Sequence, residues 1–405
     1  MSDQAAIFVT LGVILLLGVL ADLVGRRMKL PRVTLLILAG IAIGPAGLDL
    51  LPASATAWYP LVSKVALLII GFLLGGRLAW RHLEKSGRRV LSFSAFEVLG
   101  VAVALFLGLW IAGAPLAMAL VLAGIAPASA PAAVVSVVDK LGAKGDFTDS
   151  LLGIVAVDDA WGLIVFSVML AVAAALAGGG GWADALTHGG RELGMALLVG
   201  IALGVPSAWL VGRVRGGDPM EAEALGMVLL AGGAALYLGA SFILAAMVLG
   251  AAVINLGHEE HRPFDAVEKV EWPVLVIFFV LAGAEADLGR IAGLGLVGGV
   301  YVVLRAAGLV AGAWLGGTLA GAPMRHRVWM GPAILPQAGV ALGMALVAGD
   351  RLPDLKQDII AVVIGSTVLF EILGPVLTRV ALVRTGDAGR GADASRDVSG
   401  AGRPG

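Results

Sequence analysis

The sequence predicts an all-α polytopic membrane protein with thirteen transmembrane helices, and three observations carry this prediction. Of the 405 residues, 59% are hydrophobic and 14% are charged, whereas a soluble domain has about 25% charged residues. Polar breaks divide the chain into apolar runs of the length that a bilayer requires. Basic residues are also concentrated in alternate connections. The composition excludes a cytosolic enzyme and a nucleic-acid-binding protein, and the absence of Cys excludes thiol chemistry.

The predicted spans follow one another with short connections. The first is expected to be retained, because residues 1–6 carry an acid and no base, unlike the start of a cleaved signal peptide. Four glycines at 178–181 link the sixth span to the seventh, and Leu238 and Gly239 separate the eighth from the ninth. In chain order the spans cover residues 5–24, 33–51, 60–79, 90–112, 115–138, 149–176, 191–212, 222–238, 240–256, 271–287, 291–319, 327–349 and 358–382.

The positions of Lys and Arg predict the orientation. With the N-terminus outside, 22 of the 28 basic residues lie on inside connections, five lie on outside ones, and Arg305 lies within a span. This distribution predicts an N-out, C-in topology. Fusing the eighth and ninth spans would move later basic connections to the wrong side. We therefore expect a transmembrane domain over residues 1–384 and a disordered cytoplasmic tail over residues 385–405, which is small, polar and charged.

Ionisable side chains lie near the middle of four predicted spans. Such groups are costly in a bilayer and mark a transport path or a buried pair. Asp158 and Asp159 lie about ten residues, or ~15 Å, into the sixth span, about half of the ~30 Å hydrocarbon core. Adjacent helix positions point about 100° apart, so one carboxylate can face a cavity while the other reaches a neighbouring helix. The other ionisable residues near the middle of a predicted span are Glu97, Arg305 and Glu371.

The adjacent acids are interpreted as a proton/cation exchange site. The alternative is a static polar network with Arg305, but two acids facing one mid-membrane cation would leave surplus negative charge. Glu97 could pair with Arg305 and so free Asp158, it could sense pH, or it could be a plain buried hydrogen-bonded residue. Glu371 is interpreted as a structural group that pairs inside the thirteenth span.

Paired prolines predict two broken helices. Pro127 and Pro131 lie within the fifth span, and Pro332 and Pro336 lie within the twelfth. Prolines in membrane helices are often mere kinks, but here spans four to six and spans eleven to thirteen repeat the same pattern of mid-membrane charge around a broken helix. This repetition predicts inverted repeats with crossed discontinuous helices, which are typical of secondary transporters.

Two polar residues accompany these breaks. Ser129 and Gln337 could offer oxygens to a cation, or they could stabilise the unwound segments together with Pro131 and Pro336.

In its VDDAWG segment at residues 157–162, the chain resembles the monovalent cation:proton antiporter superfamily. It is most similar to the Asp-Asp branch, which includes sodium/proton antiporters of the NapA and NhaA kind. The resemblance covers residues 1–384. Supporting segments are LPRVTLLILAGIAIGP at 30–45, APASAPAAVV in the fifth span, FFVLAGAEADL at 278–288 and LPQAGVALGMAL at 335–346.

The resemblance implies roles for individual residues and an NhaA-like fold. Asp159 would be the carboxylate that binds the monovalent cation and the proton, Asp158 its accessory partner, and Arg305 the basic residue that faces them. It also implies a homodimer and an elevator-like movement. The moving core would be spans 90–176 and 291–382, the dimer scaffold spans 5–79 and 222–287, and the linker span 191–212.

This chain differs from many related antiporters at two positions, and both differences bear on the expected mechanism. Electrogenic relatives have Lys where this chain has Arg305, and a buried Lys can lose its proton whereas Arg effectively cannot. We therefore expect electroneutral exchange, with one proton per cation, as in the Arg-containing subtype. Ala130 stands where many exchangers have an Asp, so one common cation ligand is missing.

The sequence thus predicts a sodium or lithium/proton antiporter in the cytoplasmic membrane that uses no cofactor. A potassium/proton antiporter of the same fold is the nearest alternative, followed by an organic-ion symporter with a similar inverted repeat. An intramembrane aspartyl protease is disfavoured, because its two acids come from different helices with a GxGD motif that this chain lacks. We do not expect an enzyme.

Overall fold

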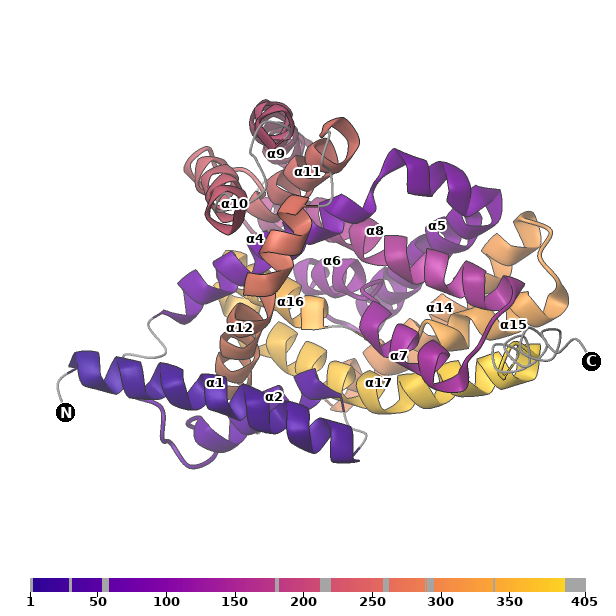
Figure 1. The fold of residues 1–405 in the computed structure, drawn as a ribbon, viewed down its shortest axis with the longest axis horizontal. Helices are drawn as coiled ribbons and strands as arrows, with labels where there is room; N and C mark the ends of the chain where they lie inside the picture. Colours follow the sequence, from indigo (N-terminus) through magenta and orange to yellow (C-terminus); the bar gives the residue numbers. More distant parts are fainter. Residues whose placement is uncertain are drawn as a thin grey trace, which may run out of the picture.

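The computed structural model describes residues 3–28, 31–52, 58–178, 182–211, 220–257, 262–287, 289, 295–337 and 339–389, and its elements there are helical (Figure 1). In chain order they are α1 (Asp3–Met28), α2 (Arg32–Ile43), α4 (Tyr59–Arg77), α5 (Trp80–Ile111), α6 (Leu116–Ile125), α7 (Pro131–Leu141), α8 (Asp146–Ala177), α9 (Trp182–Val211), α10 (Met220–Tyr237), α11 (Phe242–Leu256), α12 (Arg262–Ala284), α14 (Gly295–Leu319), α15 (Met324–Ala333), α16 (Gly339–Arg351), the 3₁₀ turn η1 (Pro353–Leu355) and α17 (Lys356–Thr385).

Each predicted span coincides with one helix or, for the fifth and twelfth spans, with a pair of helices. Seven helices of the described residues are long and apolar enough to cross a membrane, which supports a multi-pass membrane protein. The number of crossings and the N-out orientation remain predictions.

The break between the eighth and ninth spans is confirmed. Helix α10 ends at Tyr237, and Gly239 adopts φ +67°, a left-handed conformation that glycine adopts without steric cost. The Ser241 hydroxyl then accepts a hydrogen bond from the backbone N–H of Leu244, at 3.4 Å, and so caps the start of α11.

Several predicted span boundaries differ from the structure, among them the end of the second span and the start of the fourth. Helix α2 ends at Ile43 rather than continuing to residue 51, because the sequence Gly-Pro-Ala-Gly at 44–47 turns the chain and the Leu48 N–H returns to the Ala42 carbonyl at 2.8 Å. Helix α5 begins ten residues before the predicted start of its span, and it is kinked at Gly87, whose φ is +71°. The cytoplasmic connection predicted before the fourth span is therefore partly helical.

The predicted disordered tail begins too early. Helix α17 extends to Thr385, and Asp387 beyond it is 4% exposed. The Asp387 carboxylate accepts hydrogen bonds from the backbone N–H and the hydroxyl of Thr148, both at 3.0 Å, in the first turn of α8. This contact satisfies a backbone donor of that helix end and fixes the chain as far as Gly389. Residues 390–405 lie outside the described residues.

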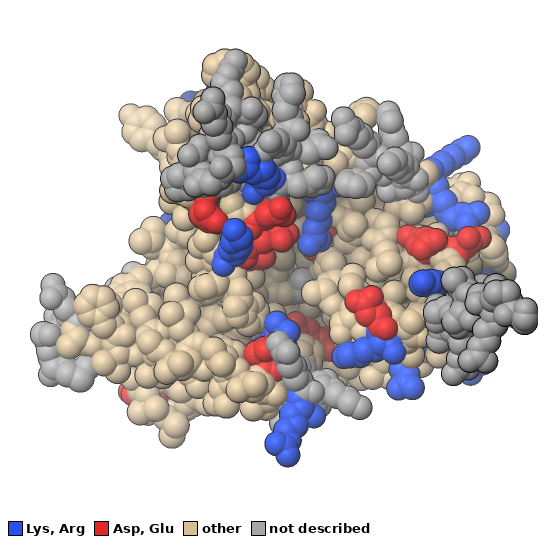
Figure 2. All heavy atoms as spheres, viewed as in Figure 1, with Lys and Arg blue, Asp and Glu red and all other residues tan. Residues whose placement is uncertain are grey.

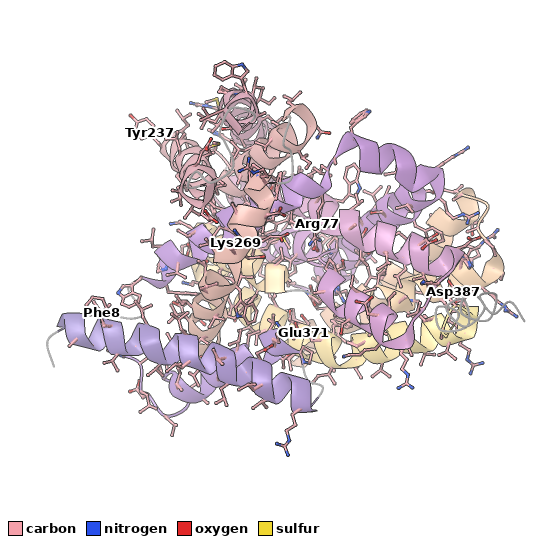
Figure 3. All side chains as sticks on the ribbon, in the orientation of Figure 1. Phe8, Arg77, Tyr237, Lys269, Glu371 and Asp387 are labelled. Carbon is pink, nitrogen blue, oxygen red and sulfur yellow. The ribbon has the colours of Figure 1, made fainter. Side chains whose placement is uncertain are left out.

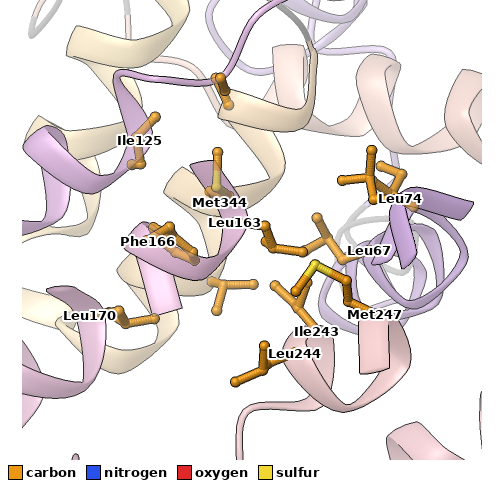
Figure 4. Close-up of a cluster of buried hydrophobic side chains, with 14 of the residues drawn as sticks. Leu67, Leu74, Ile125, Leu163, Phe166, Leu170, Ile243, Leu244, Met247 and Met344 are labelled. Carbon is orange, nitrogen blue, oxygen red and sulfur yellow. The ribbon is translucent and has the colours of Figure 1, made fainter. Parts of the chain in front are cut away.

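The helices form two groups in space (Figure 1). Helices α1, α2, α4, α10, α11 and α12 pack on one side, α5 to α8 and α14 to α17 pack on the other, and α9 contacts both α8 and α11. Between the groups lies an apolar cluster in which Leu67 of α4 and Met247 of α11 face Leu163 of α8 and Met344 of α16 (Figure 4). The assignment of the first group as dimer scaffold and of the second as moving core remains a prediction.

Charged side chains are unevenly distributed over the surface. In the face drawn in Figure 2, the surface over the N-terminal part of α1 is largely uncharged, whereas Lys, Arg, Asp and Glu gather elsewhere, including near the other end of this helix. Phe8 and Leu16 of α1 are 74% and 69% exposed. Large exposed apolar side chains are expected where a helix faces lipid or another apolar surface.

Helices α5 and α14 pack closely along a row of glycines. Gly308, Gly312 and Gly316 are four residues apart and so share one face of α14. A Cβ on Gly312 would lie 2.4 Å from the carbonyl oxygen of Phe96 in α5. Small residues let membrane helices approach at backbone distance, and this approach places Arg305, one helical turn before Gly308, beside α5.

We expect Gly312→Val to destabilise the protein by about 1–3 kcal/mol, because the added side chain must push α5 and α14 apart. A lower thermal unfolding midpoint in detergent would register this effect. Gly299→Val is the matched control, since a Cβ on Gly299 of the same helix meets nothing within 4 Å. Equal midpoints for the two variants would contradict close packing at Gly312.

Candidate functional site

The two predicted helix breaks meet inside the second helix group. The first separates α6 from α7 over residues 126–130, and the described part of the second, between α15 and α16, covers residues 334–337. The backbone N–H of Ala130 donates to the carbonyl of Pro336 at 2.9 Å and so joins the two unwound segments. Pro131 opens α7, where its missing N–H costs nothing. Both breaks are thus confirmed.

Arg305 of α14 binds both breaks. Its side chain is fully buried. Nε donates to the Ala126 carbonyl at 2.9 Å and Nη2 to the Ala128 carbonyl at 3.0 Å, both in the first break, while Nη1 donates to the Leu335 carbonyl in the second at 2.8 Å. The guanidinium also lies 4.5 Å from the ring centre of Phe370. Arg305 therefore satisfies carbonyls that unwinding deprives of their helical partners.

These contacts revise the sequence interpretation of Arg305. The sequence suggested a direct charge pair with the aspartates or with Glu97, but no ion pair joins Arg305 to a carboxylate within the described ranges. The physical reason is that the unwound carbonyls offer acceptors in the directions of three of the five guanidinium donors.

Asp158 faces α5. It is fully buried, and the Ser94 hydroxyl donates to its Oδ1. Glu97 is also buried, and neither of its carboxylate oxygens nor Asp158 Oδ2 has a hydrogen-bond partner among the described residues. The role of Glu97 therefore stays a prediction, whether it pairs with Arg305, senses pH or is a plain buried residue.

Asp159 faces a different direction, as the turn of about 100° between neighbouring helix positions requires. It is 4% exposed, and its Oδ2 lies 3.6 Å from Nη1 of Arg77, which is the last residue of α4. The other oxygen, Oδ1, is buried and has no hydrogen-bond partner in the described part of the chain. The backbone of Ser129, in the first break, lies beside this carboxylate. Asp159 thus stands between a helix break and a half-exposed cation.

Comparison with known proteins identifies the family. A family model described as the transmembrane part of sodium/hydrogen exchangers matches residues 12–383. The chain belongs to the sodium/hydrogen exchanger family. The exchanger is also 25% identical over 286 residues to the ammonium/H⁺ antiporter subunit AmhT of Alkalihalophilus pseudofirmus, a match that covers 66% of this chain and 68% of that protein.

Solved structures show the same fold. The sodium/proton antiporter MjNhaP1 of Methanocaldococcus jannaschii at pH 8 has a TM-score of 0.77 and 19% identity over 95% of this chain and 99% of that one. An electron-microscopy structure of the same antiporter has a TM-score of 0.70 and 18% identity, over 95% and 98% of the two chains. The resemblance to the cation:proton antiporter superfamily is therefore confirmed. The exchanger is a cation/proton antiporter and not an enzyme.

Oxygen atoms without hydrogen-bond partners mark where the exchanger could hold a cation. Asp159 Oδ1 and the hydroxyl of Ser129 are both buried and have no hydrogen-bond partner among the described residues. Hard cations prefer such oxygen ligands. Gln337, in the second break, donates to the Tyr301 hydroxyl at 3.4 Å, and this contact anchors the break to α14. The described residues contain no group of His, Asp and Glu arranged for a multivalent metal.

Glu371 of the exchanger has a structural contact outside its own helix. The Thr34 hydroxyl of α2 donates to its carboxylate, and this bond links α17 to α2. Figure 3 places Glu371 where these two helices approach. The sequence predicted a structural pair within the thirteenth span, and the structure replaces that partner by a residue of the second span.

Sequence reasoning missed three residues that contact these acids. Ser94 had a usable signal, because it precedes Glu97 by three positions and so shares its helix face in an otherwise apolar span. Thr34 had none, since a single hydroxyl in an apolar run is common. Arg77 counted only as one of the basic residues that mark the inside, and nothing in its sequence neighbourhood indicates a contact with Asp159.

Proposed function

We propose that this antiporter exchanges Na⁺ or Li⁺ for H⁺ at Asp159. The observation that carries the proposal is the position of this carboxylate, which is buried, has one oxygen without a hydrogen-bond partner among the described residues, and lies beside the first helix break. An ionised Asp159 would bind the cation together with oxygens such as the Ser129 hydroxyl, and a protonated Asp159 would not. Asp158 would be the accessory acid, held by the Ser94 hydroxyl.

The proposed exchange is electroneutral. Arg305 keeps its proton, because a guanidinium does not deprotonate in proteins, and three of its donors bind backbone carbonyls. One carboxylate would then carry either one proton or one monovalent cation in each crossing. No cofactor is needed for this cycle.

The proposed movement is an elevator-like displacement of α5–α8 and α14–α17 against the remaining helices. The apolar cluster between the two groups favours it, because apolar contacts are non-directional and need no paired donors and acceptors to be broken. We further propose a homodimer formed through the scaffold group and a location in the cytoplasmic membrane.

Ammonium and potassium are the alternative cations. The similarity to the AmhT subunit favours testing ammonium, and potassium remains the alternative from the sequence. The family match favours cation/proton exchange over an organic-ion symporter.

Proteoliposomes with a trapped pH dye would test the proposal by pulses of Na⁺, Li⁺, K⁺ and NH₄⁺, with and without a potassium/valinomycin clamp. Vesicles that contain Asp159→Asn give the background dye signal caused by NH₃, which crosses the lipid without a transporter. We expect a sodium-evoked proton movement that the clamp leaves unchanged. A response to potassium or ammonium but not to sodium would identify that ion as the exchanged cation instead. A sodium response that changes under the clamp would refute electroneutral exchange.

We expect the apparent affinity for the cation to weaken as pH falls. If one proton competes with the cation for Asp159, protonation removes the binding form, and the half-saturating concentration should rise by up to about tenfold per pH unit on the acid side. Initial rates measured against sodium concentration at a series of pH values would show this. An affinity that stays constant across the series would contradict a shared site.

A further inference from the structure

Arg77 connects the two helix groups at the candidate site. It is the last residue of α4, in the group with α11 and α12, whereas Asp159 is on α8 in the other group. Nη1 of Arg77 lies 3.6 Å from Oδ2 of Asp159. Figure 3 shows Arg77 where α4 approaches α8. The exchange carboxylate of one group therefore contacts a fixed positive charge of the other.

The surroundings of Arg77 differ from those of a static buried ion pair. The Arg77 side chain is 43% exposed while that of Asp159 is 4% exposed, so the cation is partly hydrated and can leave without losing its solvation. The charge of Arg77 also acts on Glu271 of α12, beside Glu268, on its own side of the interface. A second acid is thus near when Asp159 is no longer charged.

We propose that Arg77 is a coupling residue, the scaffold's counter-cation for the ionised and vacant Asp159. This inference rests on the proposed role of Asp159 in exchange. While Asp159 is charged and empty, the ion pair holds α8 against α4. A proton removes the carboxylate charge, and a bound Na⁺ neutralises it and repels the guanidinium. Either substrate therefore releases the pair and lets the core move.

Such a pair would disfavour crossing of the empty carrier and so favour coupled exchange. If the core could move with Asp159 empty and charged, the site could carry a cation across the membrane and return without a proton. Each such cycle would move one net positive charge, and the antiporter would leak cations down the membrane potential. Arg77 would also compete with the cation for Asp159 and so lower the apparent cation affinity.

Substitution of Arg77 separates coupling from exchange. In proteoliposomes at equal pH on both sides, with the potential set by potassium and valinomycin, we expect Arg77→Gln to admit sodium in a potential-dependent way without proton movement. Its apparent sodium affinity should increase by about two- to fivefold, the effect of losing a half-exposed competing ion pair. Arg77→Lys keeps the charge and should remain coupled.

Arg88→Gln is the matched control. Arg88 is an exposed basic residue on the first part of α5 and has no interaction with Asp159 among the described contacts. Arg77→Met retains an apolar stem and provides a second neutral variant should Arg77→Gln fail to fold. Wild-type coupling and affinity in the neutral Arg77 variants would overturn the proposal, as would equal changes in Arg88→Gln.

Asp159→Asn distinguishes this proposal from the function on which it rests. If that variant still exchanges, Asp159 is not the exchange group and the proposed function fails. If it is inactive while the neutral Arg77 variants remain coupled, the proposed function stands and only the coupling role of Arg77 is lost.

Discussion

Asp159→Asn is expected to reduce cation/proton exchange to the level of protein-free vesicles. Asn keeps the size of the side chain but neither ionises nor binds a proton, so neither half of the exchange remains. The fold should persist, because Asp159 Oδ1 has no hydrogen-bond partner among the described residues and the ion pair with half-exposed Arg77 contributes at most about 1 kcal/mol. Sodium-evoked dye signals and the gel-filtration profile of the same preparation measure both effects.

Asp149→Asn provides the control for this variant. Asp149 lies in the first turn of α8 and is exposed, so its substitution removes an acid from the same helix far from the breaks. It should exchange as the wild type does. Retained exchange in Asp159→Asn, or an equal loss in both variants, would remove Asp159 from the mechanism.

Arg305→Met is expected to destabilise the protein more than any other single substitution considered above. Three buried carbonyls on two unwound segments lose their donor, and each unsatisfied group costs about 1–3 kcal/mol. The contact with Phe370 is lost as well. The thermal unfolding midpoint in detergent should fall by many degrees, and exchange should be lost because the two breaks are no longer held together.

Two further variants test this interpretation of Arg305. Arg305→Lys keeps a cation but lacks the planar fork that reaches acceptors in three directions, so its midpoint should lie between those of Arg305→Met and the wild type. Arg327→Met is the control, because partly buried Arg327 donates through Nε to the Ala322 carbonyl at 2.6 Å. A midpoint for Arg305→Met close to that of Arg327→Met would mean that the breaks do not depend on Arg305.

Much of the fold could be predicted from the sequence because its determinants are local. Apolar length and polar breaks locate the helices, and Gly239 ends a turn by its own conformation. Pro127 and Pro336, which lie in the two unwound segments, lack a backbone donor wherever they are placed, so both breaks are properties of the chain itself. The adjacency of Asp158 and Asp159 fixes that their side chains point in different directions, whatever surrounds them.

The partners of these side chains depend on packing between helices far apart in the sequence, and only the tertiary structure decided them. Whether Arg305 meets a carboxylate or backbone carbonyls depends on where two distant breaks come to lie against α14. The Thr34–Glu371 contact joins residues 337 positions apart, and Arg77 reaches Asp159 because α4 packs beside α8. The sequence by itself determined which ionisable residues lie within the predicted spans. The packing of the helices determined which groups those residues contact.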